Sequence, residues 1–176
     1  EALRYRFAAV CINPYYVKIA GKQLHGSGVK VCAVIGFPLG ATTAAAKMFE
    51  AAGAVEDGAG EIDLVMNVGA FKGGQNKYVL DELAGVVEAA GGRPVKVIIE
   101  TGLLTDTEKI MACRLAKESG ARFVKTCTGF GPGQATVADV RLMKKAVGPE
   151  LGVKASGGVR TRQAARELIA AGASRI

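Results

Sequence analysis

Short runs rich in valine and isoleucine alternate along the whole chain with longer segments of helical spacing, and this alternation restricts the fold most. Near-continuous apolar runs such as Val95–Ile99 are typical of strands buried on both faces, as in a parallel sheet. The expected strands are Phe7–Asn13, Val29–Phe37, Glu61–Asn67, Val95–Thr101, Arg122–Thr128 and Gly152–Ser156, and a seventh begins at Ser174.

Helical patterns fill the intervals between these strands. The expected helices are Thr42–Gly58, Gln75–Ala90, Asp106–Ser119, Thr136–Val147 and Thr161–Ala171. Asp106 and Thr136 have the side chains of N-caps, and Phe49 belongs to the apolar spacing of the first of these helices. Glu1–Arg6 resembles the tail of a further helix.

Repeated strand–helix units predict an α/β fold with a parallel sheet and right-handed crossovers. Two architectures compete, an open doubly wound sheet and a closed (β/α)8 TIM barrel. An open sheet should bind a nucleotide through a glycine-rich turn, but neither G-x-G-x-x-G nor G-x-x-x-x-G-K-[ST] follows any expected strand. Polar residues instead occur near the ends of several strands, which favours the barrel.

No linker or low-complexity segment divides the chain, so we expect a single barrel domain over residues 1–176. A barrel of this kind has about 250 residues. We therefore expect an incomplete barrel, in which the first strand with its helix and the end of the last unit are missing.

The net charge of +7 raises the question of nucleic-acid binding. The lysines and arginines are scattered singly, without interleaved aromatic residues, which argues against a nucleic-acid partner. The chain shows neither a signal peptide nor an apolar stretch of 18 residues, so we expect no membrane association. Its four cysteines form no C-x-x-C pair and are expected to be reduced thiols of a cytoplasmic protein.

Lysines interrupt four of the expected strands, although burying an ammonium group is costly. Lys30 and Lys96 lie near the start of their strands, whereas Lys125 and Lys154 lie near the ends, where barrel enzymes keep their active sites. Consecutive strands are usually neighbours, so Lys125 and Lys154 should face each other at the barrel mouth.

Two ammonium groups in a dry site repel each other, and desolvation also favours loss of a proton. One lysine could then be a neutral amine that attacks a carbonyl, while the other assists proton transfer. The alternative is that both lysines reach solvent or pair with carboxylates for stability.

A carboxylate is needed to move protons during imine formation. Asp63 interrupts an apolar strand and is the first candidate, and Glu100 at the end of another strand is the second. Glu61 lies on the same face as Asp63 but nearer the strand start, where a structural role is expected. A buried ion pair of Asp63 with Lys96 or Lys125 is the alternative, and it is compatible with catalysis.

A phosphate is expected to bind near the turn after the last complete strand, because backbone N–H groups and a helix N-terminus favour an anion there. Glycines are also ordinary turn formers, so the motif alone is weak. The candidate phosphate- and substrate-binding residues are Thr128, Gly129, Ser156, Gly157 and Gly158.

No metal site is expected from the sequence. His25 is the only histidine and lies in a loop at the opposite end of the expected barrel, which makes a Cys–His pair and a His/Cys metal site improbable.

Seven motifs together resemble the deoxyribose-phosphate aldolase family, in order and across essentially the whole chain. They are Val10–Pro14, Val34–Gly40, Glu61–Asp63, Ile99–Leu104, Phe123–Thr126, Gly129–Gly131 and Val153–Arg160. The resemblance implies a class I aldolase on a (β/α)8 barrel that reversibly cleaves 2-deoxy-D-ribose 5-phosphate to D-glyceraldehyde 3-phosphate and acetaldehyde. It also implies that the reaction needs no metal or other cofactor.

The same resemblance implies roles for three residues. Lys125 forms the Schiff base, Lys154 tunes it and assists proton transfer, and Asp63 joins the proton relay. Cys127 stands where the family commonly has serine and, by strand parity, should point the same way as Lys125.

Two rival hypotheses remain open. In the first, the chain is another Schiff-base aldolase that acts on a ketose phosphate or a 2-keto acid. In the second, it is an inactive fragment that only binds phosphosugars. Barrels with this helix pattern often dimerise, so we also expect a homo-oligomer such as a dimer.

Overall fold

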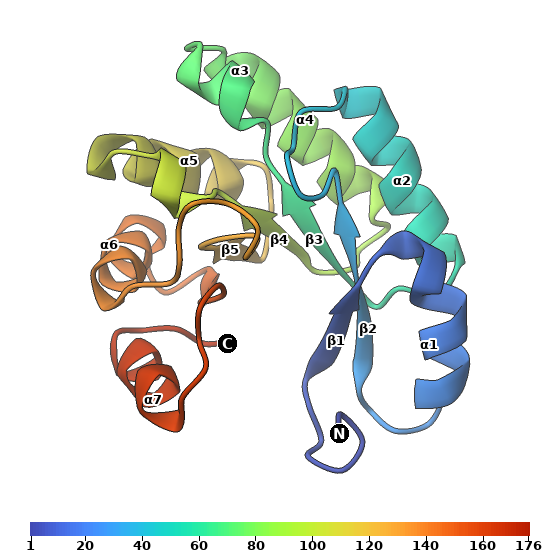
Figure 1. The fold of residues 1–176 in the computed structure, drawn as a ribbon. Helices are drawn as coiled ribbons and strands as arrows, with labels where there is room; N and C mark the ends of the chain where they lie inside the picture. The colour runs from blue at the N-terminus through green and yellow to red at the C-terminus, as the bar shows by residue number, and fades with distance from the viewer.

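The computed structural model describes all residues, 1–176, and contains one parallel sheet. Its six strands are paired in chain order, each parallel to the next. The strands are β1 (Ala9–Ile12), β2 (Lys30–Ile35), β3 (Glu61–Val65), β4 (Val95–Ile98), β5 (Phe123–Lys125) and β6 (Gly152–Lys154). The sheet curls into a half-barrel with the helices around its outer side, and this confirms the expected incomplete (β/α)8 architecture (Figure 1).

Seven α-helices connect and cover the strands (Figure 1). They are α1 (Val17–Leu24), α2 (Ala44–Glu56), α3 (Val68–Lys72), α4 (Asn76–Ala89), α5 (Asp106–Glu118), α6 (Val137–Val147) and α7 (Arg162–Ala170). Two 3-10 turns, η1 (Pro14–Tyr16) and η2 (Thr101–Leu103), follow β1 and β4. No helix combines the length and the apolar character that crossing a bilayer requires.

Side chains that alternate between the two faces of the sheet separate the hydrophobic core from the charged residues. Residues such as Ile62, Leu64 and Val97 belong to the main hydrophobic cluster against the helices. Their neighbours in the chain, Asp63 and Lys96, point to the opposite face of the sheet, because successive side chains of a strand alternate. The chemistry of this chain therefore lies inside the half-barrel, on the face turned away from the helices.

Helix ends agree with the sequence at some positions and differ at others. Thr136 caps α6 as expected, because its side chain accepts a hydrogen bond from the Asp139 N–H. Asp106 does not cap α5: Thr105 does, in a reciprocal capping box with Glu108. The expectation for Asp106 was wrong because the side chains of Thr105 and Glu108 together satisfy two backbone donors at the start of the helix.

Three further local expectations were wrong. Glu1–Arg6 forms turns and no helix. Phe49 on α2 is 83% exposed, so it does not pack into the core. Helices α1 and α3 were not expected; α3 has five residues, one of them glycine, and is stabilised by packing of the buried Phe71 and not by its intrinsic propensity.

Candidate active site

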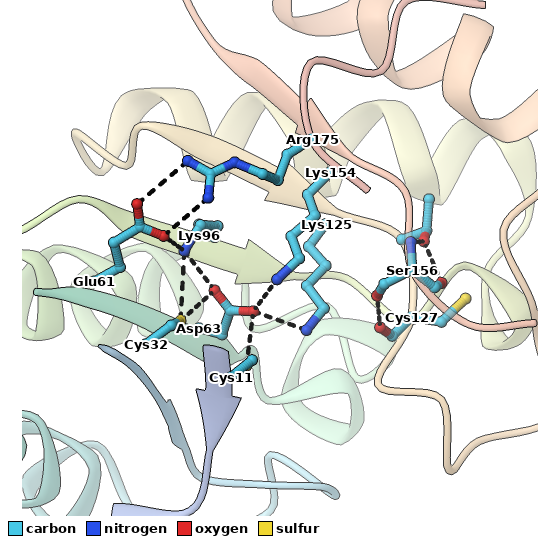
Figure 2. Close-up of polar contacts among 11 residues, drawn as sticks. Cys11, Cys32, Glu61, Asp63, Lys96, Lys125, Cys127, Lys154, Ser156 and Arg175 are labelled. Atoms are coloured by element: carbon cyan, nitrogen blue, oxygen red, sulfur yellow. Dashed lines mark hydrogen bonds and ion pairs between the residues drawn. The ribbon is translucent and has the colours of Figure 1, made fainter. Parts of the chain in front are cut away.

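Lys125 and Lys154 are direct partners in the register of β5 and β6. Their Nζ atoms converge on one atom, Oδ2 of Asp63, at 2.8 Å from Lys125 and 2.9 Å from Lys154 (Figure 2). The expected approach of the two lysines is therefore present. It occurs across a shared carboxylate, so the two ammonium groups do not face each other without a counter-ion.

Asp63 accepts more than these two hydrogen bonds. Its Oδ1 accepts from Lys96 Nζ at 2.8 Å and from Cys32 Sγ at 3.1 Å, while Cys11 Sγ donates to Oδ2 at 3.4 Å (Figure 2). The carboxylate is fully buried. Its two oxygens thus have separate partners, with Lys96 and Cys32 on the first and the candidate reactive lysines on the second.

The charges around Asp63 keep it ionised. Burial alone would raise the pKa of this carboxyl, but the ammonium groups of Lys125, Lys96 and Lys154 outweigh burial and hold the pKa far below its usual range. The same attraction raises the pKa of Lys96 against the opposing effect of its burial. Asp63 is consequently an anion at any pH at which the protein would work.

A second layer of charges lies beneath this carboxylate. Glu61 pairs with Lys96 at 2.7 Å and with Arg175 at 3.3 Å (Figure 2). The expected structural position of Glu61 and the expected ion pairs of Asp63 with Lys96 and Lys125 are all present. Arg175 was not expected: it joins β6 through a parallel bridge to Lys154, where a seventh strand was expected to begin.

The two lysines open into a cavity of about 410 Å³ at the carboxyl ends of the strands. Besides Lys125 and Lys154, its lining residues are Cys11, Ile12, Asn13, Val34, Phe37, Thr128, Phe130, Ser156 and Ile176. The position of this cavity is the one where barrel enzymes bind their substrates. Asn13 was not singled out as a pocket residue, although its place at the end of the first strand was an available signal.

The candidate hydroxyl groups of Thr128 and Ser156 line this cavity, but both protons are used within the protein. Thr128 Oγ1 donates to Glu100 Oε2 at 2.6 Å, and Ser156 Oγ donates to the Cys127 carbonyl at 2.6 Å. Each hydroxyl can still accept a hydrogen bond. Neither is free to donate one to a phosphate in this arrangement.

Gly129, Gly157 and Gly158 do not line the cavity. Gly157 and Gly158 both have positive φ, and a β-carbon at Gly158 would collide with the Gln134 side chain. The backbone N–H groups of Gly157 and Gly158 have no hydrogen-bond acceptor in the chain. Close packing therefore explains why these two positions are glycines, and their N–H groups remain available for an anion.

Glu100, the second carboxylate candidate, belongs to a different part of the molecule. It forms no ion pair with Lys125 or Lys154, and Oε2 accepts from both the N–H and the hydroxyl of Thr128. Its backbone is left-handed, at φ 56°, which turns the side chain toward the loop after β5. The side chain therefore does not contact either lysine, because the strand ends at Ile98 and parity no longer aims residue 100 into the barrel.

Cys127 is likewise not in the cavity. Its fully buried thiol contacts the Thr101 hydroxyl at 3.3 Å and packs near Gly133. The parity argument was wrong here because β5 ends at Lys125, two residues earlier. A serine-to-cysteine difference at this position therefore acts on loop packing and not directly on the pocket.

One group of three side chains has the right types and spacing to approach a metal ion, Cys11, Cys32 and Asp63. Three ammonium groups already contact Asp63 at hydrogen-bond distance. Their positive charge opposes a cation at this position. His25 lies at the end of α1, outside this group.

The half-barrel and the lysine–carboxylate cluster at its strand ends together define an enzyme of the barrel class. A sequence model described as DeoC/LacD family aldolase matches residues 1–175. The chain therefore belongs to the DeoC/LacD aldolase family.

Individual relatives agree with this assignment. The chain is 58% identical to proteins named deoxyribose-phosphate aldolase from Bacillus cereus and Enterococcus faecalis, over 100% of this chain and 79% and 80% of theirs. Among solved structures, an aldolase called QR15 matches 96% of this chain and 75% of its own, with 45% identity and a TM-score of 0.91. The deoxyribose phosphate aldolase of Aeropyrum pernix, described as tetrameric, matches 99% of this chain and 74% of its own, with 34% identity and a TM-score of 0.92.

Proposed function

We propose that this chain is a class I aldolase that reversibly cleaves 2-deoxy-D-ribose 5-phosphate to D-glyceraldehyde 3-phosphate and acetaldehyde. The observation that carries the proposal is the convergence of Lys125 and Lys154 on Asp63 Oδ2 inside a cavity. Family membership and 58% identity to deoxyribose-phosphate aldolases support the choice of substrate. The whole of residues 1–176 is proposed to act as one domain.

Lys125 is the proposed nucleophile. Lys125 first loses its ammonium proton to water in the cavity, the neutral amine attacks the substrate aldehyde carbon, and loss of water from the carbinolamine leaves a protonated imine. The bond between substrate carbons 2 and 3 then breaks: the hydroxyl on carbon 3 loses its proton, and the electron pair moves into an enamine on Lys125. Protonation of the enamine and hydrolysis of the imine release acetaldehyde.

Asp63 and Lys154 are the proposed proton-transfer residues. Asp63 is ionised in the free protein because cations surround it, so it holds both amines in place and is able to accept a proton during the cycle. Before Lys125 reacts, Lys154 already lies 2.9 Å from the same carboxylate oxygen. A proton that leaves or returns to the carbinolamine oxygen is therefore exchanged within one hydrogen-bonded group.

The substrate phosphate is proposed to bind at the turn that follows β6. The unpaired N–H groups of Gly157 and Gly158 precede α7 and supply donors for an anion. Ser156, Thr128 and Gly129 are proposed to complete the substrate contacts, with the two hydroxyls acting as acceptors for substrate hydroxyl groups.

The reaction is proposed to need no metal, because the imine supplies the electron sink that a metal would supply otherwise. Prolonged dialysis against EDTA should leave the turnover rate unchanged. A loss of rate that added divalent cations restore would contradict this part of the proposal. We also propose a cytoplasmic, homo-oligomeric protein, a dimer being the simplest assembly; the four free thiols are consistent with the cytoplasm.

Borohydride reduction in the presence of 2-deoxyribose 5-phosphate tests the central assignment. The imine should be trapped as a stable adduct on the Lys125 peptide, and Lys125→Met should abolish the adduct. Lys30→Met is the matched control, because Lys30 is exposed at the start of β2 and forms no ion pair. An adduct on any lysine other than Lys125 would rule out the assignment, and a panel of ketose phosphates and 2-keto acids would identify another substrate.

A further inference from the structure

Two cysteines lie side by side on the face of the sheet that carries the lysines. Cys11 of β1 and Cys32 of β2 are direct partners in the strand register. Partner residues of adjacent strands are about 4.8 Å apart, and the α-carbons of a disulfide are usually 4.4–6.8 Å apart. The two sulfur atoms also lie within 4.8 Å of each other. The backbone thus already places this pair at a separation that a disulfide can join.

The two thiols point toward the same group. Cys11 Sγ donates to Oδ2 of Asp63 at 3.4 Å, and Cys32 Sγ donates to Oδ1 at 3.1 Å (Figure 2). Because one carboxylate receives both hydrogen bonds, the side chains converge and do not diverge across the strand pair. Direct contact of the two sulfur atoms requires a rotation about the Cα–Cβ bonds.

A peroxide-reactive pair requires one thiol that the peroxide can reach and a second thiol close behind it, and the surroundings of these two cysteines differ in this way. Cys11 is exposed and lines the 410 Å³ cavity, whereas Cys32 is fully buried behind it. The neighbouring Cys32 thiol lowers the pKa of Cys11, burial and the Asp63 carboxylate oppose this, and the ammonium groups of Lys125 and Lys154 lower it. The neighbouring Cys11 thiol and burial raise the pKa of Cys32. Because Cys11 is the thiol that a peroxide in the cavity can reach, Cys11 is the attacking thiol and Cys32 the resolving one.

We propose that Cys11 and Cys32 are an oxidation site that forms a reversible intramolecular disulfide when the protein meets a hydroperoxide. Nothing in the proposed aldolase cycle requires this reaction. It rests on the strand register, the separation of the sulfurs and the unequal exposure of the two thiols.

The reaction has two steps. The Cys11 thiolate attacks one peroxide oxygen, a sulfur–oxygen bond forms, the oxygen–oxygen bond breaks, and the hydroxide that leaves takes up a proton to become water. The Cys32 sulfur then attacks the sulfenic acid of Cys11: the sulfur–sulfur bond forms, the sulfur–oxygen bond breaks, and the second water carries away the Cys32 proton. Two electrons pass from the thiols to the peroxide, and a dithiol reductant returns them.

The other two cysteines provide internal references. Cys113 in α5 and Cys127 after β5 are fully buried, and burial raises the pKa of both thiols, that of Cys113 to about 12. Because Cys11 is exposed to the cavity and these two thiols are not, Cys11 should be oxidised faster than either.

Peptide mapping of the full chain tests the proposal. The protein is treated with hydrogen peroxide, its remaining thiols are alkylated, and its peptides are separated without reductant. The expected product joins the Cys11 and Cys32 peptides and lacks two hydrogen atoms relative to their sum, and dithiothreitol should regenerate both thiols. Cys113→Ser should form the same product, since Cys113 takes no part.

Two variants separate the steps. In Cys32→Ala the oxidation should stop at a Cys11 sulfenic acid that dimedone captures, and in Cys11→Ala Cys32 should remain unmodified. Peroxide-treated wild-type protein in which Cys11 is oxidised while Cys32 stays a free thiol would overturn the proposal. Because the readout is a peptide mass in the wild-type chain, it does not depend on folding of the variants or on aldolase activity.

Discussion

Asp63 accepts hydrogen bonds from five side chains, and the division of these donors between its two carboxylate oxygens determines the arrangement of the candidate active site. Lys96 and Cys32 occupy Oδ1, which leaves Oδ2 to Lys125, Lys154 and the more distant thiol of Cys11. Lys96 has no access to the cavity, so it acts on the reaction only through Asp63. We therefore regard Lys96 as a positioning residue that keeps the carboxylate ionised and correctly turned.

Replacing Lys96 by methionine tests this role. Removal of one of three cations should raise the pKa of Asp63, because an opposite charge at this distance lowers a carboxyl pKa by about 1–3 units. The Asp63 carboxyl, followed by carbon NMR as the pH is lowered, should therefore become protonated at a higher pH in the variant than in the wild-type protein. Lys30→Met, which removes an exposed lysine, is the control and should leave this titration in place. A folded Lys96→Met variant in which Asp63 titrates as in the wild type would contradict the role.

Glu100 is a second residue that we expect to act on substrate binding indirectly, in this case through Thr128. Its carboxylate holds Thr128 by two hydrogen bonds and has a buried Oε1 without a partner. Thr128 forms part of the cavity wall. Loss of two hydrogen bonds worth about 0.5–1.5 kcal/mol each should loosen this wall.

Replacing Glu100 by alanine should therefore raise KM for the phosphosugar roughly tenfold while kcat changes much less. The Lys125 imine should still be trapped by borohydride, since no lysine contacts Glu100. Glu100→Gln, which keeps one oxygen acceptor for Thr128, should recover part of the affinity. A large fall in kcat with unchanged KM would instead place Glu100 in the chemistry.

At the scale of elements, helices α2 and α4 are joined by a fully buried ion pair. Lys47 Nζ lies 2.8 Å from Glu82 Oε1 and donates to the Val65 carbonyl at 2.9 Å. Burial lowers the pKa of Lys47 and raises that of Glu82, more than their attraction compensates. Such a pair contributes little net stability, but each partner depends on the other.

Replacing Lys47 by methionine should lower the free energy of unfolding by about 3–5 kcal/mol, because Glu82 is left as a buried, unpaired charge. Adding Glu82→Gln should restore more than half of that loss, since glutamine is neutral and still accepts from the Asn67 N–H. Urea unfolding of the two single variants and the double variant measures the coupling. Simple additivity of the single effects would contradict this account.

For the whole molecule, the buried charges predict how stability depends on pH. The pKa of Asp63 is lower in the folded chain than in the unfolded one, so its contribution is complete above about pH 4 and is lost as the pH falls. The pKa of Lys96 is raised, so its contribution is complete below about pH 10 and is lost as the pH rises. The unfolding free energy should therefore be highest between these limits.

Urea unfolding at a series of pH values from about 3 to 7 measures the acid side of this curve. Stability should fall toward acid, and Asp63→Asn should flatten the fall because the titrating group is gone. Asp81→Asn, which alters an exposed pair with Lys77, should keep the original slope. An equal acid slope in Asp63→Asn would show that other carboxyls determine it.

Local sequence predicted much of this architecture. The six strands and the five long helices lie where period-two and helical patterns predicted them, with ends that differ by a few residues. Lys125, Lys154 and Asp63 were singled out as candidate site residues because a charged residue in an apolar strand conflicts with its surroundings. Errors are concentrated beyond strand ends, at Glu100 and Cys127, where alternation no longer controls direction.

The sequence by itself determined the alternation of strands and helices and the face of the sheet on which each charged side chain lies, because both depend on the local period of the backbone. Only the tertiary structure decided that Lys96, Cys11 and Cys32 join Lys125 at one carboxylate, and that the hydroxyls of Thr128 and Ser156 are already bound. These contacts join residues far apart in the chain. They depend on the register and curvature of the sheet, which no short segment encodes.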